Sequence, residues 1–322
     1  MISSHTRELL AALQVRGIKL GLDKVHRLLE RLDGAPPRAV QVGGTNGKGS
    51  VVFGLEAIAV AQGLRVGTFT SPHLIDPTER IRIDGRDLTG AEFDERAASL
   101  ARRLDGWATD DAELAQVTHF EFLLALAIET FVHRGVELAI LEVGLGGRLD
   151  ATTAVPVHAC AITSVALDHQ RFLGADIASI AAEKAGIVRP GIPLLVGPLA
   201  GPAARVVAEH AAIAGAPLRK ISPVDGVING MWGDHQRINA ALSLALAGTI
   251  GLDDGARARQ ALAGTRVPAR CQRVDGTPEL LIDGAHNPQA AWALSRVLAA
   301  NPVAGETDLL VAVGEDKDAR GI

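Results

Sequence analysis

The sequence predicts an α/β protein whose main unit is a mostly parallel sheet carrying a phosphate-binding loop. Short apolar segments alternate with segments of helical periodicity over most of the 322 residues, which is typical of β-α-β units and a sheet covered on both faces. A glycine-rich loop joins an expected strand to an expected helix near residue 45. A break containing Pro268 precedes a second, shorter run of alternating elements.

The strands of the main unit are predicted from short apolar runs, and the helices from longer segments with apolar residues at helical spacing. The expected strands are Arg38–Val42, Leu64–Thr70, Glu137–Val143 and Ala159–Val165. The expected helices are Lys48–Gln62, Thr118–His133, Ile177–Ala185, His235–Gly248 and Ala256–Ala263. Because strands and helices alternate, neighbouring strands are expected to run parallel.

The break at Gly264–Arg270 predicts a domain boundary, with one domain over residues 1–267 and another over 268–322. The second would contain a strand at Leu280–Ile282, a helix at Gln289–Ala300 and a strand at Asp308–Val313. With about 55 residues it is small for an independent α/β unit. Because the chain ends soon after the last strand, we expect an incomplete Rossmann-like domain that leaves an apolar edge and face exposed.

Charge and composition exclude several classes of protein. The chain has 32 basic and 37 acidic residues, a net charge of −5, and without basic runs this argues against a nucleic-acid partner. No apolar run approaches the ~20 residues of a membrane span, and the N-terminus lacks a signal-peptide pattern. Two cysteines, Cys160 and Cys271, are too few for a disulfide framework and suit a reducing compartment. We expect a soluble, cytoplasmic, monomeric protein without a membrane partner.

The glycine-rich loop has the composition of a phosphate-binding site. It consists of Gly44, Thr45, Asn46, Gly47, Lys48, Gly49 and Ser50. Glycines let backbone N–H groups approach phosphates closely, and a helix N-terminus adds partial positive charge. Lys48 supplies a full charge, and Ser50 can reach a magnesium ion. The spacing departs from the strict G-x-x-x-x-G-K-[ST] pattern because Gly49 intervenes, and the alternative is a glycine-rich turn without a ligand.

Polar residues also follow three other strands, at the strand ends where open α/β sheets bind ligands. Ser71, Glu142 and His169 stand at or just after these ends. If the strands are parallel neighbours, these side chains could hold magnesium beside a phosphate, although magnesium prefers oxygen to imidazole. Simpler interpretations stay open for each residue. Ser71 could open a turn before the proline that follows it. Glu142 could pair with Arg148, and His169 could be an ordinary loop histidine.

Together these segments resemble the folylpolyglutamate synthase/dihydrofolate synthase family of the Mur ligase superfamily. The similar stretches lie in the family's order over nearly the whole chain. They are Gly44–Ser50, Thr70–Leu74, Glu79–Ile81, Thr118 with Phe120 and Glu121, Glu142–Thr152, Leu167–His169, Glu183–Ile187, His235 and Gln236 with Asn239–Ala241, and Asp283–Pro288. No single stretch is specific, but their combination is. The main domain would then be the ATP-binding central domain of a Mur-type ligase.

The resemblance implies that Gly44–Ser50 binds the phosphates of ATP and that Ser71, Glu142 and His169 ligate Mg²⁺. It also implies that Lys184 is carbamylated and becomes a further metal ligand. From the sequence alone, Lys184 would be a cation that favours a helix C-terminus. The resemblance reverses that interpretation, and the chemistry is reasonable because a desolvated lysine loses its proton more easily and can then capture carbon dioxide.

Further implied residues lie on both sides of this site. Those implied to contact the nucleotide are Asn239, Arg270 and Asp283. His286 lies in the same second-domain motif and is expected, with Lys48 and Lys184, to be catalytic. Those implied to contact the pterin side are Asp150, Ala151 and Thr152 and, by a looser similarity, Gly21, Leu22, Asp23 and Lys24.

The implied enzyme is an ATP- and Mg²⁺-dependent ligase. A carboxylate of dihydropteroate, or of a folate's terminal glutamate, would attack the γ-phosphate of ATP, and the amine of L-glutamate would then attack the acyl phosphate. Closure of the second domain would orient the amine and exclude water. Two alternatives stay open: another Mur-type amino-acid ligase, and a truncated ATP-binding homologue without ligase activity.

Three departures from the family's pattern keep these alternatives open. Thr153 stands where the family usually has Asn, which removes an amide's paired donor and acceptor. Ala269 and Cys271 stand where Gly and an aromatic residue are usual, and Ala enters positive φ less easily than Gly. The chain also ends where the family continues with further strands and helices.

Overall fold

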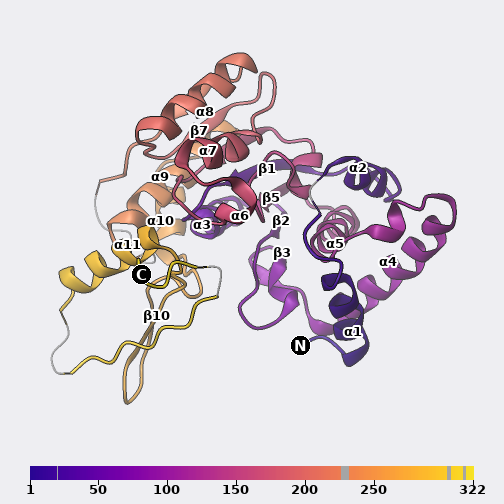
Figure 1. Ribbon diagram of the computed structural model, residues 1–322, viewed down its shortest axis with the longest axis horizontal. Coiled ribbons are helices and arrows are strands. Elements are labelled where there is room, and N and C mark those ends of the chain that lie inside the picture. The colour runs from indigo at the N-terminus through magenta and orange to yellow at the C-terminus, as the bar shows by residue number, and fades with distance from the viewer. Residues whose placement is uncertain (20, 226–231, 303–305, 315–316) are drawn as a thin grey trace.

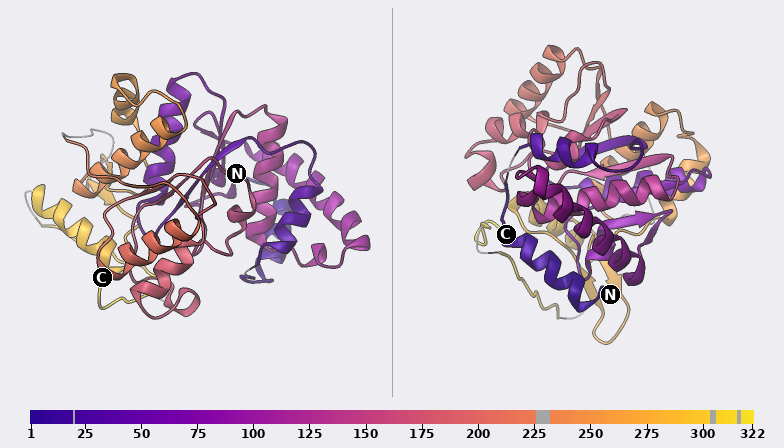
Figure 2. Two further views of the ribbon diagram at one scale, coloured as in Figure 1. Left: turned by 90° about the horizontal axis from the view of Figure 1, so that it is seen from above. Right: turned by 90° about the vertical axis from the view of Figure 1, so that its right-hand side faces the viewer.

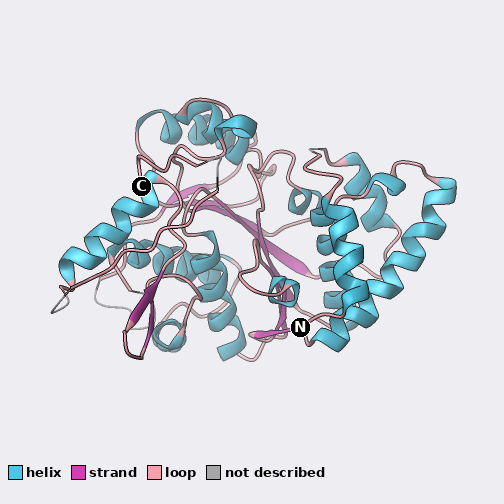
Figure 3. Ribbon diagram, turned by 60° about the horizontal axis from the view of Figure 1, so that its bottom comes forward, coloured by secondary structure: helices cyan, strands magenta, loops and turns pink. Residues whose placement is uncertain are grey.

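The structure, a computed structural model, describes residues 1–19, 21–225, 232–302, 306–314 and 317–322. Within these ranges an eight-stranded sheet has helices on both faces, and two further strands form a separate hairpin (Figure 1; Figure 3). The strands of the large sheet are β1 (Arg38–Gly43), β2 (Val66–Phe69), β3 (Ile81–Ile83), β4 (Arg86–Asp87), β5 (Leu138–Glu142), β6 (Ala159–Ile162), β7 (Leu194–Val196) and β8 (Leu218–Lys220).

The strand order is β4-β3-β2-β5-β1-β6-β7-β8. All neighbouring strands from β2 to β8 in this order are parallel. The strands β3 and β4, at one edge, pair antiparallel with β2 and with each other. The prediction of a mostly parallel sheet is therefore confirmed. In the register of the central strands, Val42 of β1 pairs with Glu142 of β5 and with Ala161 of β6. The carboxyl ends of these strands consequently lie side by side, and so do the loops that follow them.

The α-helices are α1 (Ser4–Gln14), α2 (Asp23–Glu30), α3 (Lys48–Ala61), α4 (Gly90–Asp110), α5 (His119–His133), α6 (Gln170–Leu173), α7 (Ile177–Ala185), α8 (Gly201–Ile213), α9 (Asp234–Thr249), α10 (Ala256–Gly264) and α11 (Pro288–Ala300). Short 3-10 helices occupy Pro77–Arg80, Leu114–Gln116 and Ala151–Ala154. The described helices include none that is long and apolar enough to cross a membrane.

Two apolar clusters fix the helices on the sheet. Val40 and Val42 of β1 pack with α3, α9 and α10 on one face. On the other face, Ala39 belongs to a cluster to which α1, α2, α4, α5, α7 and α8 all contribute buried residues. Alternate residues of β1 thus enter opposite clusters, as the pleat of a strand requires, which explains why this strand reads as a continuous apolar run.

Most predicted elements of the main unit are present with small shifts at their ends. Thr118, expected as the first residue of a helix, is instead its N-cap: its side chain accepts from the backbone N–H of Glu121 in a capping box. Sequence patterns did not indicate α1, α2, α4 and α8, or the outer strands β3, β4, β7 and β8. The four strands are only two or three residues long, and α4, although it has 21 residues, is of mixed polarity, so their periodic signals are weak.

The C-terminal segment differs from the predicted β-α-β run. The expected strand Leu280–Ile282 is β10, but it pairs antiparallel with β9 (Gln272–Val274) in a hairpin. The expected strand Asp308–Val313 is wrong, because these residues adopt no regular secondary structure. An apolar run becomes a strand only where a neighbour satisfies its backbone groups, and no described strand lies beside this one. Leu310 is 96% exposed. Figure 2 shows this segment at one end of the molecule and the N-terminal helices at the other.

Candidate functional site

The predicted phosphate loop connects β1 to α3, and two of its glycines are required by the backbone. Gly47 caps α3 with φ +90°, and a Cβ there would lie 2.5 Å from Asn239 Oδ1. Gly44 has φ +137°, and its Cβ would lie 2.0 Å from Thr163 Oγ1. Both angles favour glycine, and a Cβ at either position would force its neighbour to shift. The loop therefore packs tightly against the end of β6 and against α9.

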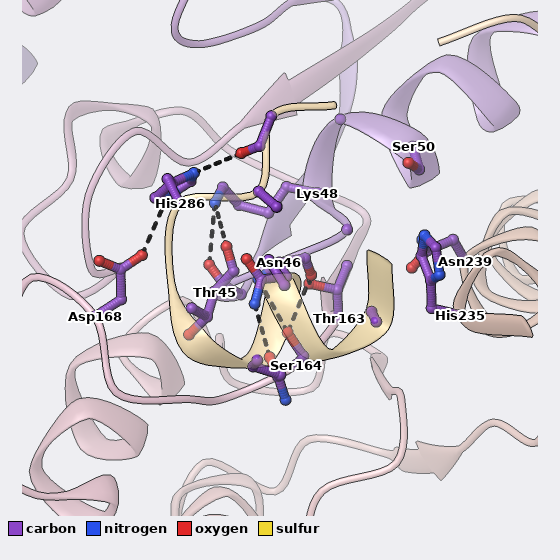
Figure 4. A pocket seen from close by; sticks show the side chains of 18 of the residues that line it. Thr45, Asn46, Lys48, Ser50, Thr163, Ser164, Asp168, His235, Asn239 and His286 are labelled. Atoms are coloured by element: carbon purple, nitrogen blue, oxygen red, sulfur yellow. Dashed lines mark hydrogen bonds and ion pairs between the residues drawn. The ribbon is translucent and has the colours of Figure 1, made fainter. Parts of the chain in front are cut away.

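Residues at the end of β6 hold the loop in shape (Figure 4). The backbone N–H of Thr45 donates to Ser164 O at 2.8 Å, and that of Asn46 donates to Ser164 Oγ at 2.9 Å. The Thr163 hydroxyl donates to Asn46 O at 2.6 Å. Sequence analysis missed Thr163 and Ser164, although two polar residues at the end of a predicted buried strand were an available signal. They make the loop a preformed feature of the sheet.

Lys48 and Ser50 lie in the positions expected of phosphate-site residues. Lys48 Nζ donates to Gly44 O and Thr45 O, each at 3.1 Å. Burial lowers the pKa of Lys48, while the charge of Glu142 opposes that shift. The hydroxyl of Ser50 is buried and has no hydrogen-bond partner among the described residues. A buried polar group without a partner is costly, so this hydroxyl is suited to a ligand.

A cavity of about 450 Å³ lies beside the loop, and residues predicted from distant parts of the sequence line it together. This size is typical of small-molecule sites. The predicted residues in its lining are Gly44–Ser50, Ser71, Glu142, His169, Lys184, Asn239, Arg270, Asp283 and His286. The predicted convergence of the strand ends at the loop is therefore confirmed. Gly21–Lys24 and Asp150–Thr152 are not in this lining.

Glu142 is a buried carboxylate of the site, with 5% of its surface exposed. It accepts from the backbone N–H of Ser71 at 3.2 Å. Burial raises the pKa of Glu142, and the charge of Lys48 opposes that shift. Arg148 pairs with Glu183 at 2.8 Å, so the alternative pairing of Glu142 with Arg148 is wrong. The carboxylate is left facing the cavity and the lysine.

His169 also faces the cavity, and its backbone is in the left-handed region at φ +49°. Burial lowers its pKa, which favours the neutral imidazole that metals bind. The described residues contain no cluster of three or more His, Cys, Asp or Glu side chains arranged as a metal site. The predicted Mg²⁺ set contributes only Glu142 and His169 of these types, together with the hydroxyl of Ser71, so it stays a prediction.

Lys184 is buried, with only 4% of its surface exposed. Its Nζ donates to Gly44 O in the phosphate loop at 3.0 Å. Burial, and then the nearby charge of Lys48, lower the pKa of Lys184 to about 7. Lys184 does lie in the last turn of α7, as the interpretation from the sequence alone expected. Its amine is, however, buried in the cavity lining, and the lowered pKa leaves a large part of it neutral near pH 7.

The C-terminal segment supplies the far wall of the cavity. Asp283 accepts from the backbone N–H groups of Cys271 at 2.7 Å and Ala285 at 2.8 Å. Ala269 and Cys271 have φ of +50° and +46°, so the alanine that replaces the family's usual glycine does adopt the left-handed conformation. His286 Nδ1 lies 2.8 Å from Gly284 O, and its Nε2 lies 3.4 Å from Asp168 Oδ2.

The residues predicted for the pterin side lie outside the cavity lining. Asp150 accepts from the backbone N–H groups of Gly144 and Leu145, each at 2.9 Å, and of Thr152 at 3.0 Å. It therefore shapes the loop after β5. A Cβ on Gly144 would lie 2.7 Å from the Phe120 ring, so this aromatic side chain borders both the loop and the N-terminus of α5.

Lys24 lies on the same side, beside the capping box of α5. Its Nζ is 2.9 Å from Glu121 Oε2 and 2.9 Å from Gln116 O. Gly21 and Leu22 precede α2, which begins at Asp23. Thr153, which departs from the family's usual Asn, donates its hydroxyl to Gly147 O at 2.7 Å. The pterin contacts themselves stay predictions.

Comparison with known proteins assigns this arrangement to a family. No protein-family model matches the sequence. A dihydrofolate synthase/folylpolyglutamate synthase of Escherichia coli (strain K12) is 35% identical over 328 residues, covering 96% of this chain and 75% of that protein. A folylpolyglutamate synthase of Lacticaseibacillus casei is 35% identical over 290 residues, covering 81% of this chain and 68% of that protein. The chain belongs to the folylpolyglutamate synthase/dihydrofolate synthase family.

Solved structures of the family have the same fold. An FPGS-AMPPCP-folate complex has a TM-score of 0.84 at 32% identity, covering 93% of this chain and 80% of that chain. E. coli FolC in complex with DHPP and ADP has a TM-score of 0.82 at 32% identity, covering 94% and 76%. A bifunctional enzyme with Mn, AMPPNP and L-glutamate bound has a TM-score of 0.79 at 38% identity, covering 92% and 74%. The chain is an ATP-dependent ligase of the glutamate-adding kind, as the resemblance implied.

Proposed function

We propose that this ligase activates the carboxylate of dihydropteroate or of a folate as an acyl phosphate and joins L-glutamate to it. The observation that carries the proposal is the convergence of the phosphate loop, Glu142 and Lys184 at one cavity. Relatives solved with folate, with DHPP and with L-glutamate support the classes of substrate.

The loop would bind the nucleotide through its backbone. Its N–H groups and the start of α3 provide donors and partial positive charge for the phosphates. Lys48 would move its ammonium from the carbonyls of Gly44 and Thr45 to the phosphate oxygens, a short displacement within the same loop. Asn239, beside Gly47 of the loop, and Arg270 and Asp283 of the C-terminal wall also line the cavity and would contact the rest of the nucleotide.

Magnesium fits the residues beside the loop. The buried hydroxyl of Ser50 lacks a partner among the described residues, and Glu142 offers a buried carboxylate that a cation would keep ionised. Ser71 and His169 would complete the set, since all four line the cavity. When bound, Mg²⁺ would neutralise charge on the phosphate oxygens. A relative has Mn bound together with AMPPNP, which supports a divalent cation here.

We infer that Lys184 is carbamylated. Its neutral amine would attack carbon dioxide, forming an N–C bond and releasing one proton, and so become a carboxylate beside the loop. The lowered pKa of about 7 supports this step because only the neutral amine is nucleophilic. Burial beside Gly44 O would protect the product from water.

The transfer would take place between the two walls of the cavity. An acceptor carboxylate oxygen would attack the γ-phosphorus as the bond to ADP breaks, with Lys48 neutralising the developing charge. The glutamate nitrogen would then attack the acyl carbon as the bond to phosphate breaks. His286, held by Gly284 O and near Asp168, would help to orient the reacting groups and exclude water.

The pterin would lie on the side of Asp150–Thr152 and Gly21–Lys24, with the Phe120 ring close to Gly144 of the loop after β5. We further propose that residues 1–267 and 268–322 are separate functional units, the second belonging to the small Rossmann-like domain that closes over the nucleotide. Its exposed apolar residues Leu280–Ile282 and Leu309–Val311 support an α/β surface that further structure would cover.

The test is ADP release measured with dihydropteroate, tetrahydrofolate and a UDP-linked sugar as acceptors, each with glutamate or alanine. We expect release that needs Mg²⁺, a pterin acceptor and glutamate together, with amide formed in equal amount. Turnover only with a UDP-linked acceptor or alanine would instead indicate another Mur-type ligase. Folded protein that turns over none of these would contradict the proposal.

A further inference from the structure

Asp168 is a buried carboxylate whose partners come from the other end of the chain. Only 6% of its side chain is exposed. Its Oδ1 lies 2.8 Å from Lys317 Nζ, and its Oδ2 lies 3.2 Å from Asn287 Nδ2 and 3.4 Å from His286 Nε2 (Figure 4 shows the His286 contact). Burial raises the pKa of Asp168, but hydrogen bonds from His286 and Lys317 hold it well below its usual range.

Its own loop does less for this carboxylate. Within this loop, the backbone N–H of His169 donates to Asp168 Oδ1 at 2.8 Å, and the His169 ring lies 3.9 Å from Oδ1. A buried carboxylate is costly unless it is paired and hydrogen-bonded. The burial of Asp168 therefore depends on the C-terminal segment lying against the central sheet.

A second contact ties the same segment to the phosphate loop. Asn46 Nδ2 donates to Asn287 Oδ1 at 3.1 Å and to Gln289 Oε1 at 2.7 Å, and Asn287 Nδ2 donates to Asn46 Oδ1 at 2.9 Å. Asn287 also caps α11 by accepting from the backbone N–H of Ala290. One asparagine thus connects the loop, Asp168 and the start of α11.

We propose that Asp168, Asn287 and Lys317 form a latch that holds the Asp283–Pro288 turn over the phosphate loop, with Lys317 as a positioning residue for ligation. The turn carries Asp283 and His286, which line the cavity, whereas Lys317 is absent from its lining. Lys317 would act through Asp168. This role of Lys317 goes beyond the proposed function, and its kinetic test rests on the proposed ligase activity.

The latch predicts a specific defect rather than a general loss of binding. With the turn loosened, water would reach the acyl phosphate before glutamate does, so ATP would be consumed without amide formation. Asp168 immediately precedes His169, a proposed metal ligand, which would couple the latch to that site. Contacts that hold a closed state are expected to change turnover and coupling more than acceptor affinity.

The test compares Lys317→Met, Lys317→Arg, Asp168→Asn and the Asp168→Asn/Lys317→Met double variant with the parent chain. For Lys317→Met we expect kcat for amide formation to fall about tenfold, ADP released per amide to rise above the parent's ratio, and KM for the acceptor to change less. Lys317→Arg should restore most of kcat, and the double variant should be no worse than the poorer single variant. Lys220→Met, in exposed β8, is the matched control and should behave as the parent.

Amide hydrogen exchange over residues 284–300 gives a readout that does not need activity. Exchange should be faster in Lys317→Met and near the parent rate in Lys317→Arg. The latch is overturned if exchange in Lys317→Met equals that of the parent, or if the effects of the two single variants multiply. It is equally overturned if kcat and coupling are unchanged. A folded parent without ligase activity would contradict the proposed function, whereas exchange would still decide the latch.

Discussion

The two walls of the cavity are held in place by different forces. The phosphate loop follows a strand buried on both faces, and α3 packs against α9 and α10 in a continuous apolar cluster. The C-terminal wall lies on a hairpin and a helix whose apolar residues are largely exposed, among them Leu281, Ile282 and Trp292. Its link to the loop is the polar set Asn46, Asp168, Asn287 and Lys317.

Because of this difference, the phosphate loop can keep its ATP-binding shape while the C-terminal wall opens and closes. Apolar packing of α3 and hydrogen bonds from Thr163 and Ser164 hold the loop from its own side, so we expect it to stay formed whether or not the other wall is engaged. A wall held mainly by hydrogen bonds and ion pairs can release and re-engage at modest cost. A ligase needs both properties, because it must keep ATP while substrates enter and must exclude water during transfer.

The largest expected effect tests the loop wall directly. Lys48→Ala removes the loop's only full charge, and we expect ADP release to fall about 10³-fold because phosphate charge in the transition state loses its neutralising cation. A coupled ADP-release assay measures the change. Lys220→Ala is the control. Turnover retained in Lys48→Ala would refute the assignment of this lysine.

The stability of the two walls should differ for the same chemical change. Leu55→Ala in α3, where the side chain is fully buried, should lower the free energy of unfolding by about 3 kcal/mol through lost burial and a cavity. Leu310→Ala, at a position 96% exposed, should stay within about 0.5 kcal/mol of the parent. Urea unfolding of both variants measures the two values. Equal losses would show that residues 308–313 are packed.

The pKa of Lys184 gives a pH test of carbamylation. Because the pKa is lowered to about 7, the amine is protonated and unreactive below pH 7 and neutral above it. After removal of carbon dioxide we expect activity to fall about tenfold. Added bicarbonate should restore it more fully at pH 8 than at pH 6. Intact mass should show the added carboxylate, and restoration that is equal at both pH values would contradict the mechanism.

The smallest expected effect isolates the contact between the loop and α9. Gly47→Ala and Gly63→Ala introduce the same strain, since φ is +90° and +89°, but only at Gly47 does the new Cβ meet Asn239. Each should cost about 1 kcal/mol of stability from the left-handed backbone. Gly47→Ala should in addition raise the KM for ATP several-fold. Identical kinetics in the two variants would show that Asn239 does not depend on this close approach.

Local sequence patterns predicted the structure of the phosphate-loop wall better than that of the C-terminal wall. The sheet was predictable because buried parallel strands have continuous apolar sequences. The loop was predictable because glycines followed by Lys48 and Ser50, between a strand and a helix, are typical of phosphate-binding loops. The strand expected at 308–313 failed because an apolar run does not reveal whether a neighbouring strand exists. The burial of Lys184 could not be predicted from local patterns, since it depends on residues 140 positions away in the loop.

The sequence by itself determined the alternation of strands and helices, the phosphate loop and the order of the polar residues at strand ends, because these depend on neighbours along the chain. Only the tertiary structure decided that Ser71, Glu142, His169 and Lys184 share a cavity, since strand register and burial depend on residues far apart in sequence. The same holds for Asp168, which the sequence presents as one residue of a loop. Its partners become visible only when a segment 149 residues further on lies against it.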